Sequence, residues 1–206
     1  MTHTPCILLF AGPNGSGKST ITGQYPLVGY YVNADEIQRV RNCDALEAAQ
    51  IAHETRNYLV EKKQSFTMES VLSTPRNIEL LVKAKQQGYY VFCIYVTTIH
   101  SSINVDRCMA RYEAGGHGVG GNPDIGVDQR KIVDRYKRAM RLIPDLCQVC
   151  DRLLVFDNSM EKGKGKAALI AEMDGGKTTI HSSPLWSDEN IRLFLNGDYS
   201  PDVHDK

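Results

Sequence analysis

The sequence has no net charge and no long apolar run. Its 24 lysine and arginine residues balance 24 aspartate and glutamate residues. It therefore lacks the basic surface that a dedicated nucleic-acid-binding protein or a polybasic membrane anchor requires. Its longest apolar stretches, residues 6–11 and 89–96, are far shorter than the roughly 20 residues that cross a bilayer. We expect neither nucleic acid nor membrane as a partner.

Secretion signals and disulfide patterns are also missing. The first residues, Met-Thr-His-Thr-Pro, lack the positive start of a signal peptide, and a glycine-rich motif already begins at Gly12. The cysteines lie where free thiols pack: Cys6 and Cys93 in apolar runs, Cys108 on an expected helix. Cys147-Gln-Val-Cys150 has no second pair for zinc, which favours helix packing. We expect a cytoplasmic protein.

Short apolar runs alternate with helical patterns along the chain, which is typical of a parallel sheet covered by helices. Strands are predicted at residues 6–11, 28–33, 65–69, 89–97 and 151–157. Helices are predicted to open near Lys18, to cover residues 44–62, to run from a Thr74 cap to Gly88, and to cover residues 127–142. A further helix carries Val105, Cys108, Met109 and Tyr112 as its core stripe. A later strand at 166–173 and a short helix at 188–195 carry no readable motif.

A phosphate-binding loop follows the first predicted strand. Gly12-Pro13-Asn14-Gly15-Ser16-Gly17-Lys18-Ser19 fits the Walker A pattern G-x-x-x-x-G-K-[ST] in full. Its glycines let backbone N–H groups converge on a phosphate. Lys18 reaches the terminal phosphates, and the Ser19 hydroxyl is a ligand for Mg²⁺. The sequence therefore predicts a nucleoside triphosphate site.

Two carboxylates follow other predicted strands, where ligands bind in an open parallel sheet. Asp35 could take a proton from a hydroxyl that attacks the γ-phosphate. Asp35-x-x-Gln38 is equally a capping box for the next helix. Glu69 could hold a substrate hydroxyl or a metal-bound water, or be a plain strand-end carboxylate. For each of the two residues, its position alone leaves the functional and the structural interpretation open.

Basic side chains also gather beside a glycine-rich segment at residues 115–126. Arg107 and Arg111 share one helical face and could neutralise charge on a transferring phosphoryl group, although a solvated helix face is the simpler interpretation. Lys131, Arg135 and Arg138, on the helix predicted at 127–142, could likewise act on a phosphate, although a solvated helix face is again the simpler interpretation. His117, in the glycine segment, could contact phosphate or substrate or be an incidental loop residue.

These elements, in this order, resemble the zeta toxin family of P-loop kinases, in particular its compact branch. The resemblance runs from about Leu8 to Ser159. It rests on the segments Gly12–Thr20, Asn33-Ala34-Asp35, Phe66-Thr67-Met68-Glu69-Ser70, Arg111-Tyr112-Glu113-Ala114-Gly115-Gly116-His117 and Asp157-Asn158-Ser159. It differs at Ser70-Val71, where the branch carries two threonines, and in extra residues at 120–126.

The resemblance implies an α/β P-loop NTPase three-layer fold with a mainly parallel five-stranded sheet. Residues 1–160 would form the kinase domain, with 115–126 as a lid, and residues 161–206 a C-terminal extension packed on it. Asp35 takes the position of the general base, with Lys18 and Arg111 on the phosphates. The implied ATP site comprises Gly12, Pro13, Asn14, Gly15, Ser16, Gly17, Lys18, Ser19 and Thr20, with Ser19 on the metal, and the implied substrate contacts are Glu69, Ser70, Arg107 and His117.

The predicted function is transfer of the γ-phosphate of ATP, with Mg²⁺, to a hydroxyl of a sugar nucleotide such as UDP-N-acetylglucosamine. Such an activity would deplete a cell-wall precursor and act as a toxin. One alternative is a kinase for another metabolite or an antibiotic, because the fold does not fix the substrate. Another is an ATP-binding switch that acts through a protein partner. A third adds a neutralising antitoxin without altering the chemistry.

Overall fold

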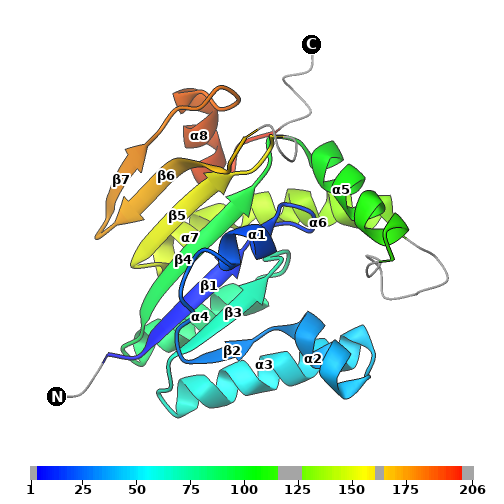
Figure 1. Cartoon of the computed structure of the whole chain (residues 1–206). Coiled ribbons are helices and arrows are strands. Elements are labelled where there is room, and N and C mark those ends of the chain that lie inside the picture. The colour runs from blue at the N-terminus through cyan, green and yellow to red at the C-terminus, as the bar shows by residue number, and fades with distance from the viewer. Residues whose placement is uncertain (1–3, 116–126, 161–164, 201–206) are drawn as a thin grey trace.

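A seven-stranded β-sheet in the order β2-β3-β1-β4-β5-β6-β7 runs through the chain (Figure 1). The computed structural model describes residues 4–115, 127–160 and 165–200. The strands are β1 (Cys6–Ala11), β2 (Tyr30–Val32), β3 (Phe66–Ser70), β4 (Tyr90–Thr97), β5 (Arg152–Asp157), β6 (Ala168–Asp174) and β7 (Lys177–Ile180). The strands from β2 to β5 pair in parallel, and β6 and β7 pair antiparallel.

The predicted fold class is confirmed, but the sheet has seven strands rather than five. The parallel strands are the five that the sequence predicts. The later strand predicted at 166–173 pairs with β5 as β6, and a hairpin then adds β7. Gly175 and Gly176 have φ values of 54° and 81°, as a two-residue hairpin turn requires. β7 is short and mostly exposed, so its residues carry little of the alternation that reveals a strand.

The second strand is shorter than predicted because its first residues bond to a side chain. Thr67 Oγ1 accepts from the backbone N–H of Val28 at 2.7 Å and donates to the Val28 carbonyl at 2.9 Å. These groups are therefore not available for strand pairing. Gly29 then turns the chain with a φ of 57°, and regular pairing to β3 begins at Tyr30.

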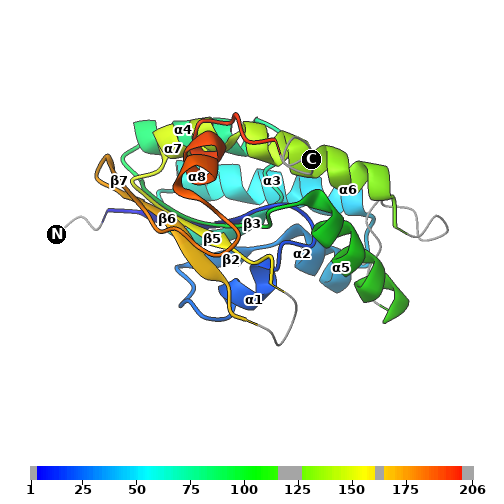
Figure 2. The same cartoon turned by 90° about the horizontal axis from the view of Figure 1, so that it is seen from above.

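Helices cover the two faces of the sheet unequally (Figure 2). One face carries α3, α4, α6, α7 and α8, and the other carries the short α1. The helices are α1 (Lys18–Thr22), α2 (Ala34–Arg41), α3 (Ala45–Glu61), α4 (Arg76–Gln86), α5 (Ser101–Glu113), α6 (Gln129–Arg141), α7 (Ile143–Val149) and α8 (Asp188–Leu195). The helix predicted from a Thr74 cap begins instead after Pro75, without a side-chain cap.

Alternate residues of the central strands feed two separate cores, because successive side chains of a strand point to opposite faces. Ile7 and Leu9 join the large core under α3, α4 and α6–α8, whereas Leu8 and Phe10 pack with Ile21 of α1. All four strand residues are at most 2% exposed. The buried sheet thus holds its strand ends in fixed positions.

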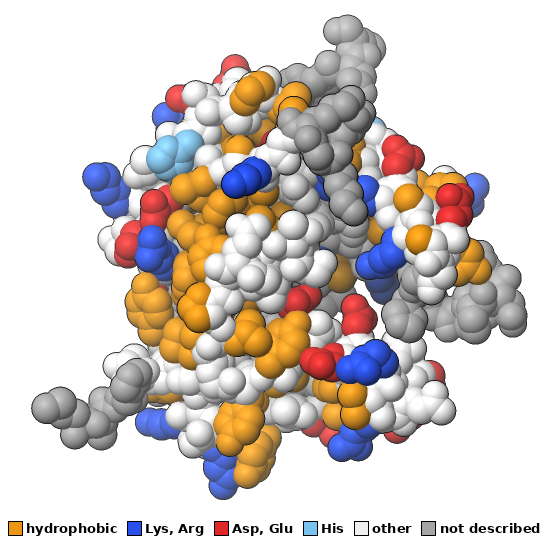
Figure 3. Space-filling model, viewed as in Figure 1, with side chains coloured by type: hydrophobic (Ala, Val, Ile, Leu, Met, Phe, Trp, Pro, Cys, Tyr) orange, Lys and Arg blue, Asp and Glu red, His pale blue; other side chains and the backbone are white. Residues whose placement is uncertain are grey.

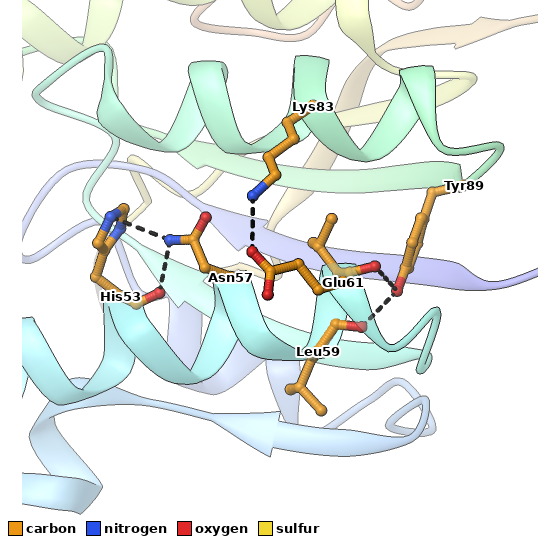
Figure 4. A network of polar contacts seen from close by, with 7 residues as sticks. His53, Asn57, Leu59, Glu61, Lys83 and Tyr89 are labelled. Atoms are coloured by element: carbon orange, nitrogen blue, oxygen red, sulfur yellow. Dashed lines mark hydrogen bonds and ion pairs between the residues drawn. The ribbon is translucent and has the colours of Figure 1, made fainter.

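Polar contacts tie α3 to its neighbours (Figure 4). Near the C-terminal end of α3, Lys83 Nζ on α4 lies 3.3 Å from Glu61 Oε1, and the Tyr89 hydroxyl donates to the Leu59 carbonyl at 2.8 Å. Within α3 itself, Asn57 Nδ2 lies 3.1 Å from Nε2 of His53, which stands one turn earlier in the helix. These contacts fix the helix that contributes His53 and Arg56 to the site below.

The C-terminal part of the described chain packs into the large core. The ring of Trp186 lies 5.5 Å from that of Phe194 and 4.7 Å from that of Tyr199. Trp186 is fully buried, and the Tyr199 hydroxyl donates to the Ile99 carbonyl at 3.1 Å. Residues 165–200 thus share the hydrophobic core of the sheet.

Cysteine positions agree with packing roles. All six thiols are free, with Cys93 and Cys108 buried. Cys147 lies in α7 and Cys150 ends it. The described residues contain no group of three or more His, Cys, Asp and Glu side chains placed to hold a metal ion. Within the same residues, no helix combines the length and the apolar character needed to span a bilayer.

Candidate active site

The predicted glycine loop connects β1 to α1 at the carboxyl edge of the sheet. A Cβ on Gly12, whose φ is 139°, would overlap the Val96 carbonyl oxygen, and a Cβ on Gly17, whose φ is 92°, would overlap Asn158 Nδ2. Only glycine fits at both positions. The loop backbone therefore lies close against the ends of β4 and β5.

Asparagine side chains from two other elements hold this loop. Asn158, directly after β5, donates to the Ser16 carbonyl at 2.8 Å. Asn104 on α5 donates to the Asn14 carbonyl at 2.6 Å and is itself fully buried. Sequence reasoning assigned neither residue a role. The position of Asn158 after a predicted strand was an available signal, whereas Asn104 carried none.

The Lys18 ammonium folds back onto the loop, where Nζ donates to the Gly12 and Pro13 carbonyls at 2.7 and 3.0 Å. Burial lowers the pKa of Lys18 to about 8, against the opposing influence of the Glu69 and Asp35 carboxylates. The Arg111 guanidinium lowers this pKa further. The charges of Glu69, Asp35 and Arg111 thus all act on Lys18 across the site.

Asp35 stands in the first turn of α2, but it does not cap the helix. Asn33 is the N-cap, and its Oδ1 accepts from the Asp35 backbone N–H at 2.9 Å. The predicted capping box from Asp35 to Gln38 is therefore wrong, because the N-cap is Asn33 and the helix begins at Ala34, two residues earlier than an Asp35 cap requires. The Asp35 side chain is exposed and borders the cavity described below.

Glu69 is held by hydroxyl groups. Its Oε1 accepts from the Tyr31 hydroxyl at 2.6 Å and from Thr22 Oγ1 at 3.3 Å. Asn33 Nδ2 donates in turn to the Tyr31 hydroxyl at 2.9 Å. Burial and the bond to Glu69 raise the pKa of Tyr31, so Tyr31 stays a donor. This chain of bonds links the carboxylate near the end of β3 to the residue that caps α2.

Ser70, at the end of β3, uses its hydroxyl oxygen within the protein. Ser70 Oγ accepts from Asn77 Nδ2 at 2.7 Å and from the Leu72 backbone N–H at 2.9 Å. Its proton remains available for a further bond, since a hydroxyl both donates and accepts. Ser70 and Asn77 both border the cavity.

Arg107 and Arg111 of α5 face the same cavity. Arg107 Nη2 donates to the Met160 carbonyl at 2.8 Å, which ties α5 to the segment after β5. Val105 and Cys108, predicted in the core stripe of this helix, are buried and pack with Ile132 of α6, and Cys108 also borders the cavity. Tyr112, predicted in that stripe, is 38% exposed because it lies on the last turn of the helix.

Of the remaining residues that the sequence singled out, some border the cavity and others do not. Ser19 and Thr20 border the cavity, as does Arg135 of α6, whose Nη1 donates to Asn14 Oδ1 at 3.3 Å. Lys131 and Arg138 are not among its lining residues. His117 and residues 116–126 of the glycine segment lie outside the described residues.

These side chains enclose a cavity of about 1060 Å³. Figure 3 shows a hollow between α5 and α2, with acidic side chains gathered toward α2 and basic ones toward α5. The volume exceeds that of a site for one small ligand, so it can hold a nucleotide and a second molecule. Its cationic lining residues are Lys18, Arg56, Arg76, Arg107, Arg111, Arg135 and Lys166, against the carboxylates of Asp35 and Glu69.

Arg56 is the main lining residue that sequence reasoning missed. It lies in the middle of α3 and is only 6% exposed. Its Nη2 donates to the Glu69 and Val32 carbonyls at 3.1 and 3.3 Å. The side chain thereby joins the ends of β2 and β3. An arginine within a polar helix gave no signal that tertiary packing would bury it.

Comparison with known proteins places these features in a family. The sequence profile of the family described as zeta toxin matches residues 31–174. An uncharacterized protein of Haemophilus influenzae is 32% identical over 117 residues, which are 53% of this chain and 83% of that protein. The matched residues run from within β2 to the end of β6, and the glycine loop lies before them.

Two solved structures share the fold at low identity. A chain of the AvrRxo1-ORF1:AvrRxo1-ORF2 complex with ATP superposes with a TM-score of 0.62 at 13% identity, over 100% of this chain and 66% of that one. A chain of the PezAT toxin–antitoxin system of Streptococcus pneumoniae superposes with a TM-score of 0.54 at 16% identity, over 96% and 86% of the two chains. This chain therefore spans just under two thirds of the AvrRxo1 chain.

Proposed function

The chain belongs to the zeta toxin family, and from this premise we propose that it is an ATP-dependent kinase whose acceptor is a sugar nucleotide. The observation that carries the proposal is one cavity bordered by Lys18, Asp35, Glu69 and Arg111. A phosphate-binding lysine, a base and a charge-stabilising arginine are the parts that phosphoryl transfer needs.

The glycine loop would hold the phosphates of ATP. Its fit is supported by two glycines at which any Cβ would overlap neighbouring atoms, and by Ser16 Oγ, which is buried without a hydrogen-bond partner. Lys18 would exchange its bonds to the loop carbonyls for bonds to phosphate oxygens. Ser19 would hold Mg²⁺ through its exposed hydroxyl. When bound, Mg²⁺ would neutralise negative charge on the phosphates of ATP.

Asp35 would act as the base. It would accept the proton from the acceptor hydroxyl as that oxygen forms its bond to the γ-phosphorus and ADP departs. Lys18 and Arg111 would stabilise the negative charge on the transferring group. Glu69, oriented by Tyr31, would position the acceptor hydroxyl beside Asp35.

For the acceptor we propose UDP-N-acetylglucosamine or a related sugar nucleotide. Support comes from the resemblance to the compact branch and from a cavity of about 1060 Å³ whose charged lining residues are mostly lysine and arginine, which suits two anionic ligands together. A protein antitoxin is a proposed partner, because one structural neighbour comes from a toxin–antitoxin system. The cytoplasm, where ATP and sugar nucleotides occur, is the proposed place of action.

Mass spectrometry tests the proposal. Purified protein is incubated with Mg²⁺, ATP and a panel of sugar nucleotides, and products heavier by one phosphate are sought. We expect phosphorylated UDP-N-acetylglucosamine with the wild type and none with Lys18→Ala. ATP binding without any phosphorylated sugar nucleotide would contradict the acceptor assignment. ATP hydrolysis that no sugar nucleotide changes would favour a switch.

A further inference from the structure

Two arginines border the cavity on the side of α3 and α4, away from α5. Arg56 projects from α3, and Arg76 is the first residue of α4. Within the described residues neither guanidinium forms an ion pair with a carboxylate. Arg56 contacts two carbonyl oxygens and, at 3.4 Å, Asn77 Oδ1. These contacts satisfy part of the Arg56 guanidinium without neutralising its charge.

A buried arginine without a carboxylate partner is costly, since removing a charge from water is repaid only by pairing or by hydrogen bonds. Arg56 is 6% exposed, and its Nε–H has no hydrogen-bond partner. Burial lowers the pKa of Arg56 to about 10, so the side chain is still charged at neutral pH. A bound anion would supply the charge partner that Arg56 lacks.

The start of α4 adds further donors beside Arg56. Its N-cap residue, Pro75, supplies no side-chain acceptor, so the first backbone N–H groups of this eleven-residue helix lack intrahelical partners. The N-terminal end of a helix carries partial positive charge and attracts anions. Thr74, Arg76 and Asn77 from this end all border the cavity.

Other charged groups near the two arginines do not cancel them. The pKa of His53 is lowered by burial and then by the positive charges of Arg76 and Arg56, while Glu54 and Glu79 oppose this shift. At His53 each of the two arginines acts more strongly on the pKa than either glutamate does. His53 is thereby kept neutral, able to donate or accept a hydrogen bond.

We propose that Arg56, Arg76 and the first turn of α4 form a subsite for a phosphate group carried by the acceptor. The inference rests on the proposed function, because it takes the glycine loop as the place of ATP. The acceptor would lie with its phosphate against α4 and its reacting hydroxyl at Asp35. An uncharged sugar would then lack the group that fixes it.

Binding measurements can separate this subsite from the ATP site. The protein is saturated with Mg²⁺ and a non-hydrolysable ATP analogue, so that the glycine loop is filled. It is then titrated in a calorimeter with pyrophosphate, UDP-N-acetylglucosamine or free N-acetylglucosamine. The variants are Arg76→Gln, an exposed position, and Arg56→Lys. Arg39→Gln is the matched control, because Arg39 is exposed on α2 and pairs with Glu36 outside the cavity.

We expect the wild type and Arg39→Gln to bind pyrophosphate and the sugar nucleotide but not the free sugar. Both site variants should bind the two phosphate compounds about tenfold or more weakly, as the loss of a charge-assisted bond predicts. Their affinity for the ATP analogue should stay within about twofold of the wild type. Thermal melting shows whether Arg56→Lys is folded, and Arg76→Gln tests the subsite if it is not.

Unchanged pyrophosphate and sugar-nucleotide affinity in folded Arg76→Gln would overturn the subsite. Equal binding of free N-acetylglucosamine would do the same. If UDP-N-acetylglucosamine is phosphorylated with an unchanged KM in both variants, the proposed function stands and the subsite falls. If pyrophosphate binding depends on the arginines while no sugar nucleotide is phosphorylated, the subsite stands and the acceptor assignment falls.

Discussion

Replacing Gly17 by alanine should weaken ATP binding through two separable effects. The first is backbone strain, because Gly17 has a φ of 92° and an L-residue in the left-handed region loses about 1–2 kcal/mol. The second is a collision of the new Cβ with Asn158 Nδ2. Asn158 must then move and give up its bond to the Ser16 carbonyl, which contributes about 1 kcal/mol.

Together these effects destabilise the binding-competent loop by roughly 2–3 kcal/mol, which is a roughly 30- to 150-fold loss of ATP affinity. Asn158→Ala alone removes the bond and should cost about fivefold. In the double variant the collision no longer exists, so only strain is added to the lost bond. The double variant should therefore bind ATP about fivefold more tightly than the product of the two single losses.

Calorimetric titration of ATP into the four proteins measures this coupling, with thermal melting to verify folding. Gly88→Ala is the matched control, because Gly88 has a φ of 88° and an added Cβ would meet nothing within 4 Å. It should lose stability but keep the ATP affinity of the wild type. Strictly multiplicative losses in the double variant would refute the contact between Asn158 and the loop as the cause.

Three further predictions concern pH, orientation and stability. Burial lowers the pKa of Lys18 to about 8, so Lys18 loses its charge above that pH. ATP affinity measured from pH 7 to 10 should therefore fall as the pH rises through about 8. An affinity that does not change with pH would contradict this. Tyr31→Phe removes the 2.6 Å hydrogen bond to Glu69. It should lower kcat/KM for the acceptor about fivefold to twentyfold and leave ATP affinity unchanged. A loss confined to ATP binding would refute the role of Tyr31 in orienting Glu69. Trp186 is fully buried, so Trp186→Ala should lower the free energy of unfolding by about 3–5 kcal/mol. Urea titrations measure this loss. A loss below about 1 kcal/mol would show that Trp186 is not part of the core.

Sequence patterns were enough to predict the site residues that lie at the ends of the parallel strands. The glycine loop and Asp35 follow β1 and β2, Glu69 lies near the end of β3, and parallel pairing brings these strand ends to one edge of the sheet. Helical spacing likewise indicated that Arg107 and Arg111 share a face. These predictions needed only local periodicity and the rule for where ligands bind in such sheets.

Groups set by tertiary packing could not be predicted in this way. Arg56 sits between glutamate, threonine and asparagine on α3, and only the packing of this helix along β2 and β3 buries it. Asn104 becomes a support of the glycine loop because α5 crosses the ends of β4 and β1. The capping of α2 by Asn33 depended on a two-residue shift of the helix start, which is no larger than the usual uncertainty of a helix boundary.

The most direct test of phosphotransfer in this cavity is the single-turnover rate of Asp35→Asn with ATP and UDP-N-acetylglucosamine. Asn33 caps α2, so the variant should fold normally and bind ATP like the wild type. Loss of the base should slow phosphate transfer by about 10²- to 10⁴-fold. Transfer at the wild-type rate would contradict the assignment of Asp35 and, with it, the proposed mechanism.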